Sequence, residues 1–170
     1  MTRKTKWMIA AGLAVAVVGG SMGGSAWILP EANPPLRYTG VIITPRADDL
    51  LRRGCFDCHS NETRWPVYTY IPPFSVLIAR HVAKGRKDLN FSKWEGKTAK
   101  NKAHKIRESY NLLVKKKMPL KTYSWLHPDA SFSEAEMGML KQDIVAVYGE
   151  KAVAPFKKKK KKKPAVKPGT

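Results

Sequence analysis

The chain has 170 residues, a length that predicts one domain with additions at its ends. Its formal net charge of +19 is unevenly spread: residues 1–6 hold three basic side chains and residues 155–170 hold eight lysines, which leaves +8 for residues 31–154. The central part is therefore basic, but not so basic that a nucleic acid is the expected partner.

An uncharged, mostly apolar run of 23 residues, Trp7 to Leu29, follows the basic N-terminus. As a helix it would be roughly 34 Å long, enough to cross a bilayer core of about 30 Å. We expect residues 1–30 to be an uncleaved signal anchor, with the inner membrane as its location and the rest of the chain facing the periplasm. A cleaved signal peptide is the alternative, because Gly24-Ser25-Ala26 offers small residues before a cut. The domain would then be secreted to the periplasm.

Residues 31–44 are expected to be a linker, because Pro30 to Leu36 reads PEANPPL, a composition typical of extended chain. A domain is expected at residues 45–150, and it begins with a short helix. Thr44 suits the N-cap of that helix, Pro45 suits its first position, and Gly54 would end it.

Further helices are predicted by apolar residues at helical spacing. The only β-branched run, Val41-Ile42-Ile43, is too short to build a sheet, so the predicted fold class is all-α with four or five short helices. The later helices are expected at Phe74 to Gly85, at Ser92 (a capping box) to about Lys117, and from a cap at Ser131 or Ser133 to Gly149.

Residues 151–170 are expected to be a disordered polylysine tail. From Pro155 onward, seven consecutive lysines and three prolines cannot bury a core. Lys157–Lys163 are interpreted either as a solvated extension or as an electrostatic tether to anionic lipid or an acidic protein surface. Nucleic acid would bind such a run in a test tube, but the expected export argues against that partner.

Cys55-Phe56-Asp57-Cys58-His59 has the spacing C-x-x-C-H, the attachment signature of c-type haem. Two thiols three positions apart on one helical turn can reach the two vinyl groups of a porphyrin and form thioether bonds. His59, next to the second thiol, then lies under the iron as the proximal ligand. A backbone carbonyl near Trp65-Pro66 or Pro72-Pro73 is expected to accept a hydrogen bond from the other nitrogen of His59.

Two other interpretations of the cysteines are open. A thioredoxin-like dithiol also uses C-x-x-C, but it lies at a strand-to-helix junction of a βαβ unit, and no sheet is predicted here. A zinc site would need a fourth ligand, and the adjacent Cys58 and His59 are awkward for a tetrahedral centre. We therefore favour haem over both.

Met118 is the candidate distal iron ligand, because it lies between two predicted helices and its thioether would give His/Met ligation and a raised reduction potential. The alternative is that Met118 is a core residue, since Met commonly fills gaps. His81, on an apolar helix face, and His127, in a loop, are weaker candidates. His104 lies among lysines and is expected to face solvent.

The order of helix, C-x-x-C-H, middle helices, Met-Pro and closing helix resembles a mono-haem class I cytochrome c. The runs Cys55–Pro73, Gly85–Ser92 and Met118–Tyr123 resemble more closely the small bacterial haem-binding domain proteins. Those proteins have a similar Cys-x-x-Cys-His-Ser-Asn-x-Thr-x-Trp-Pro stretch and a Met-Pro-x-x-x-Tyr segment. The resemblance covers about residues 33–148.

This resemblance implies one covalent haem c, held by Cys55, Cys58 and His59 with Met118 as the distal ligand, in a small cytochrome c-like domain. The expected function is one-electron transfer with a redox partner protein by a membrane-tethered carrier. A haem-based peroxidase or a gas or redox sensor with a displaceable distal ligand is one alternative, and a docking subunit of a larger redox complex is another. Six aromatic residues are candidates for porphyrin walls or for ordinary core: Trp65, Trp94, Trp125, Tyr68, Tyr70 and Tyr123.

Overall fold

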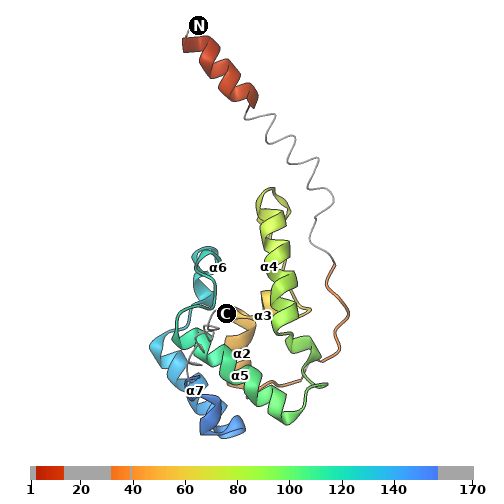
Figure 1. Ribbon diagram of the computed structural model, residues 1–170, viewed down its shortest axis with the longest axis vertical. Coiled ribbons are helices and arrows are strands. Elements are labelled where there is room, and N and C mark those ends of the chain that lie inside the picture. Colours follow the sequence, from red (N-terminus) through yellow and green to blue (C-terminus); the bar gives the residue numbers. More distant parts are fainter. Residues whose placement is uncertain (1–2, 14–31, 39, 157–170) are drawn as a thin grey trace, which may run out of the picture.

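The computed structural model describes residues 3–13, 32–38 and 40–156, and these residues form helices and loops without a strand (Figure 1). The predicted all-α class is therefore confirmed. Residues 3–13 are helical. The domain consists of six α-helices and four short 3-10 helices: α2 (Pro45–Gly54), α3 (Phe56–His59), η1 (Val67–Tyr70), α4 (Phe74–Asp88), η2 (Phe91–Lys93), α5 (Ala99–Val114), α6 (Lys121–Leu126), η3 (Pro128–Ala130), α7 (Glu134–Tyr148) and η4 (Glu150–Ala152).

The expected membrane segment, Trp7 to Leu29, lies mostly outside the described residues. Within the residues that are described, no helix is both long and apolar enough to cross a bilayer. The described residues therefore do not support the segment, and it stays a prediction.

The first helix of the domain begins as its sequence predicts. The side chain of Thr44 accepts a hydrogen bond from the Ala47 N–H, which caps α2, and Pro45 occupies the first turn. The carboxylate of Asp48 accepts hydrogen bonds from the N–H groups of Ile42 (2.7 Å) and Ile43 (3.0 Å), and both isoleucines are buried. The last residues of the expected linker over residues 31–44 thus pack into the core, ahead of the expected domain start at Pro45.

The start of α5 differs from the prediction. Its N-cap is Thr98, whose hydroxyl accepts a hydrogen bond from the Asn101 N–H. Ser92 does not cap this helix, because it is buried in η2 and its hydroxyl accepts a hydrogen bond from the Asn61 N–H at 2.9 Å. The helix also ends at Val114, earlier than expected.

The C-terminal part of the domain extends further than the sequence indicates. Ser133, one of the two predicted caps, begins α7 and forms a capping box with Glu136, and Gly149 follows the helix with φ +76°. Beyond Gly149, η4 packs on α5 and α7 and buries Ala152. Arg107 then donates hydrogen bonds to the carbonyls of residues 154 and 155. The first residues of the expected tail over residues 151–170 thus contact the domain, and Lys157–Lys163 lie outside the described residues.

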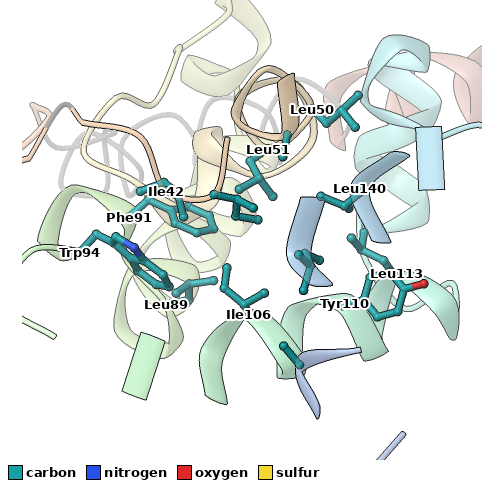
Figure 2. Close-up of a cluster of buried hydrophobic side chains, with 14 of the residues drawn as sticks. Ile42, Leu50, Leu51, Leu89, Phe91, Trp94, Ile106, Tyr110, Leu113 and Leu140 are labelled. Atoms are coloured by element: carbon teal, nitrogen blue, oxygen red, sulfur yellow. The ribbon is translucent and has the colours of Figure 1, made fainter. Parts of the chain in front are cut away.

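The hydrophobic core lies between α2, α5, α7 and the segment that follows α4 (Figure 2). Phe56 of α3 stacks on Phe91 with ring centroids 5.1 Å apart, so the core fixes the short helix that carries the cysteines. Among the described residues, α4 and α6 add no side chain to this core cluster. They extend toward the same end of the molecule in Figure 1, and an apolar hollow of about 210 Å³ lies between their side chains.

Candidate functional site

The structure brings all four predicted site residues to one cavity. Cys55, Cys58, His59 and Met118 line a cavity of about 190 Å³ together with residues of α4 and α6. Met118 is far from the other three in sequence, so this convergence is a tertiary feature that spacing alone does not determine. The remaining lining residues are Gly54, Asp57, His81, Lys84, Gly85, Asp88, Pro119, Leu120 and Tyr123.

One helical turn arranges the attachment motif around the cavity. Cys55 caps the C-terminus of α2, with its N–H bonded to the Leu51 carbonyl, and its own carbonyl accepts from the N–H groups of Cys58 (3.2 Å) and His59 (2.9 Å). Phe56 and Asp57, between the cysteines, are buried. The core thus anchors the middle of the motif while both thiols and the imidazole remain at the cavity wall.

The His59 ring is held by the end of α4. Its Nδ1 lies 2.9 Å from the Gly85 carbonyl oxygen and 3.2 Å from that of Leu89. Because carbonyl oxygens only accept, Nδ1 carries the proton and Nε2 keeps its lone pair for a metal. Desolvation lowers the pKa of His59, although these hydrogen bonds oppose the shift, so the ring is held neutral.

The carbonyl partner of His59 was therefore wrongly predicted. The two partners are Gly85 in α4 and Leu89 just after it, not residues of the loop near Trp65-Pro66 or Pro72-Pro73. The helix also continues through Gly85 to Asp88, where the sequence predicted a stop. Gly85 is needed because α4 passes close to α3: a Cβ at this position would lie 2.4 Å from the carbonyl oxygen of Cys58.

The chemistry of the thiols argues against a redox dithiol. Both cysteines are free, and desolvation raises the pKa of Cys55 to about 12 and that of Cys58 to about 11. Reactive dithiols need a lowered thiol pKa and lie next to a strand, and the described residues contain no strand. Nor do these residues bring three or more His, Cys, Asp or Glu side chains together as a metal site, so zinc is not supported.

Met118 lies at the cavity between α5 and α6. It is half-buried, packs against the hydrophobic core, and also lines two neighbouring hollows of about 280 Å³ and 780 Å³. His59 shares the 280 Å³ hollow with Met118, so both residues border the same two spaces.

The other histidines occupy different positions. His81 lines the main cavity from α4, nearer to the site than its apolar helix face suggested. His127 is engaged elsewhere, with its Nε2 2.5 Å from the Tyr68 hydroxyl. His104 is exposed, as expected, and its ring lies nearly perpendicular to that of Phe156, with centroids 5.7 Å apart.

Three of the six candidate aromatic residues border the site. Tyr68, Tyr123 and Trp125 line the 210 Å³ hollow beside the main cavity. Trp94 is instead a core residue with 1% exposure, so the ordinary core interpretation is correct for it. Trp65 donates a hydrogen bond to Asn33, and Tyr70 is half exposed.

The sequence did not single out a buried carboxylate in the motif. Asp57 is 8% exposed and accepts hydrogen bonds from Arg64 and from the Tyr123 hydroxyl (2.7 Å). Tyr123, the last residue of the Met-Pro-x-x-x-Tyr segment, was the sequence feature that could have indicated this contact, because its hydroxyl can reach the Cys55–His59 motif.

An all-helical domain with two thiols, a neutral imidazole anchored through Nδ1 and a thioether, all around one apolar cavity, has the donor set of a haem protein. The family model for the haem-binding domain matches residues 37–145, more than half of the chain, and the chain belongs to this family. Haem is therefore its cofactor. Neither the curated proteins nor the solved structures include one that the chain matches.

Proposed function

We propose that the protein is a mono-haem c-type cytochrome that transfers single electrons. In this proposal Cys55 and Cys58 form thioether bonds to the porphyrin, His59 is the proximal iron ligand and Met118 the distal one. The observation that carries the proposal is that these four side chains, from two distant segments, line one cavity. The test is whether haem stays on the denatured chain and whether Met118 sets the visible spectrum.

Side chains and backbone groups of the chain hold the proposed iron ligands in position. Hydrogen bonds from Nδ1 of His59 to the carbonyls of Gly85 and Leu89 fix the ring plane and increase its basicity toward the iron. Neutral thioether sulfur at Met118 favours the reduced state and raises the potential. When bound, the haem supplies an iron that exchanges one electron between its ferrous and ferric states.

The space next to Met118 favours a second candidate function. A hollow of about 780 Å³ borders Met118 and Pro119 on the side of α6 and α7. If Met118 leaves the iron readily, this space admits a small ligand, and the protein is a peroxidase or a gas or redox sensor. Binding of carbon monoxide to the reduced protein distinguishes the two: a carrier with a firmly held Met118 binds it slowly and weakly.

The partner of the carrier is an acidic surface of another redox protein. Four exposed lysines flank the distal ligand and are here called the rim lysines: Lys115, Lys116, Lys117 and Lys121. The five ion pairs of the described residues involve none of them. Charges in this position raise the rate of encounter with an anionic partner near the site of electron exchange.

Membrane attachment completes the proposal. The apolar run Trp7 to Leu29 behind a basic N-terminus favours an anchor in the inner membrane with the haem domain in the periplasm. Lys157–Lys163 would add a second contact to anionic lipid or to the acidic partner. Anchoring also fits the alternative of a docking subunit in a larger redox complex.

A further inference from the structure

The helix that follows the distal ligand is held in place weakly by packing. α6 (Lys121–Leu126) begins three residues after Met118 and contains no buried residue. Its Trp125 is 82% exposed and its Leu126 is 52% exposed. Burial of apolar surface therefore contributes little to the position of α6 relative to the attachment motif.

A hydrogen bond joins α6 directly to that motif. The Tyr123 hydroxyl donates to Oδ2 of Asp57 at 2.7 Å, and Asp57 lies between Cys55 and Cys58. A bond to a carboxylate is shorter and stronger than one between neutral groups. The Asp57–Tyr123 bond therefore connects the segment that carries the distal ligand to the helix that carries both thiols.

Asp57 itself is rigidly placed. Its Oδ1 accepts from the backbone N–H (3.1 Å) and Nε (3.2 Å) of Arg64, and its Oδ2 accepts from Nη2 of Arg64 at 3.1 Å. Phe56, next to it, is stacked in the core. The acceptor thus stays fixed, and any movement of the hydrogen bond comes from the Tyr123 side.

A second contact supports the same end of α6. The ring of His127, just after the helix, stacks on Tyr123 with centroids 4.5 Å apart, and its Nε2 lies 2.5 Å from the Tyr68 hydroxyl. Tyr68 belongs to η1, which follows the attachment motif. Both contacts tie α6 to the same part of the domain.

We propose that Tyr123 is a positioning residue that holds Met118 at the distal face of the haem through its hydrogen bond to Asp57. The inference rests on the proposed function and names a residue that acts on the iron through Met118. The Tyr123 N–H is bonded to the Leu120 carbonyl, and Leu120 lines the same cavity as Met118. Fixing Tyr123 therefore limits how far residues 118–120 can move away from His59.

The chain offers a matched control for the loss of one tyrosine hydroxyl. Tyr148 donates to the Ile42 carbonyl at 2.7 Å, the same length as the Tyr123 bond, but on α7 and away from the cavity. Tyr148→Phe removes a tyrosine hydroxyl bond of the same length, here to a neutral carbonyl, without touching α6. A general loss of stability would affect both variants, whereas a positioning role would affect Tyr123→Phe alone.

The experiment compares the full-length, haem-loaded wild type with Tyr123→Phe, Tyr148→Phe and Met118→Ala. Hydrogen exchange of the amides in residues 118–127 reports how firmly the segment is held. The sulfur-to-iron absorption band of the ferric protein and the rate of carbon monoxide binding to the ferrous protein report the distal bond. We expect Tyr123→Phe to speed exchange and carbon monoxide binding about tenfold and to weaken the band, and Tyr148→Phe to leave all three at the wild-type level.

Tyr123→Phe data that match those of Tyr148→Phe would overturn the inference, as would faster exchange with an unchanged band and carbon monoxide rate. A wild type without the band, and with a spectrum that Met118→Ala does not alter, contradicts the proposed Met118 ligation and with it this role of Tyr123. Comparison of the wild type with Met118→Ala therefore separates failure of the proposed function from failure of the inference.

Discussion

The Gly85 carbonyl oxygen lies 2.9 Å from Nδ1 of His59, and Gly85 has no room for a side chain because a Cβ would lie 2.4 Å from the carbonyl oxygen of Cys58. One residue of α4 thus provides both the hydrogen bond that orients the His59 ring, the proposed proximal ligand, and the close approach that makes this bond possible.

Gly85→Ala is therefore expected to destabilise the domain by about 1–3 kcal/mol, because backbone atoms have to move apart. It should also weaken the hold on His59. Gly138→Ala is the control: this glycine lies inside α7 and a Cβ added there would have no neighbour within 4 Å, so alanine should stabilise the helix by about 0.5–1 kcal/mol. Urea unfolding of both variants measures the difference, and equal effects would refute the close-approach argument.

The hydrogen bonds of His59 could not be predicted from sequence, since they join residues 26 and 30 positions apart. Glycine commonly ends a helix, so Gly85 was expected to stop α4, whereas its function depends on a tertiary contact. Predictions from neighbouring residues were correct where the structure depends only on those residues: Thr44 and Pro45 start α2, and Ser133 caps α7.

The prediction at Ser92 was wrong and α6 was not predicted, for two different reasons. Ser92 has the local pattern of a cap, but its hydroxyl binds the distant Asn61 N–H. The helix α6 buries no residue, so it has no apolar stripe to reveal it. The motif predicted Cys55, Cys58 and His59 as candidates, while the meeting of Met118 with them at one cavity required the fold.

Met118→Ala is expected to abolish the sulfur-to-iron band and to let ferrous haem bind carbon monoxide at least about tenfold faster, because the distal position loses its thioether. Visible spectra of the oxidised protein and flow kinetics of the reduced protein measure these changes. His81→Ala and His127→Ala serve as comparison variants, since both residues border the site. A spectrum altered by one of these, and unaffected by Met118→Ala, would assign the distal position to that histidine.

Replacing the rim lysines with glutamine is expected to slow oxidation of the ferrous protein by hexacyanoferrate(III), an anion, by about tenfold at low salt. The difference should disappear as salt screens the charges. The control variant has four other exposed lysines of the domain replaced with glutamine, so it loses the same charge away from Met118. If both variants slow equally, net charge alone sets the rate and the rim has no special role. The control lysines are Lys93, Lys100, Lys141 and Lys151.

Asp143 makes the stability of the domain depend on pH. Its carboxylate accepts hydrogen bonds from Arg46 (2.5 and 3.0 Å) and from Thr44 (2.9 Å), and these bonds hold its pKa below the usual value. The Asp143 carboxyl binds a proton more readily in the unfolded chain than in the folded one. Its contribution to stability is therefore present above its pKa in the unfolded state and is lost as the pH falls through its pKa in the folded state.

Asp143→Asn should therefore be less stable than wild type at pH 7, and the gap should shrink as the pH falls below the ordinary aspartate pKa toward the lower pKa of folded Asp143. Chemical unfolding at several pH values measures this gap. A gap that stays constant over the whole range would show that the charge of Asp143 does not contribute.

The most direct test of the account is acid–acetone extraction of the haem-loaded full-length protein, followed by mass measurement of the chain. Covalent attachment at Cys55 and Cys58 predicts that the colour stays with the protein, that the chain gains the mass of one haem, and that the double variant Cys55→Ala/Cys58→Ala releases its haem into the acetone. Haem that extracts freely from the wild type, leaving a chain of unmodified mass, would contradict the account.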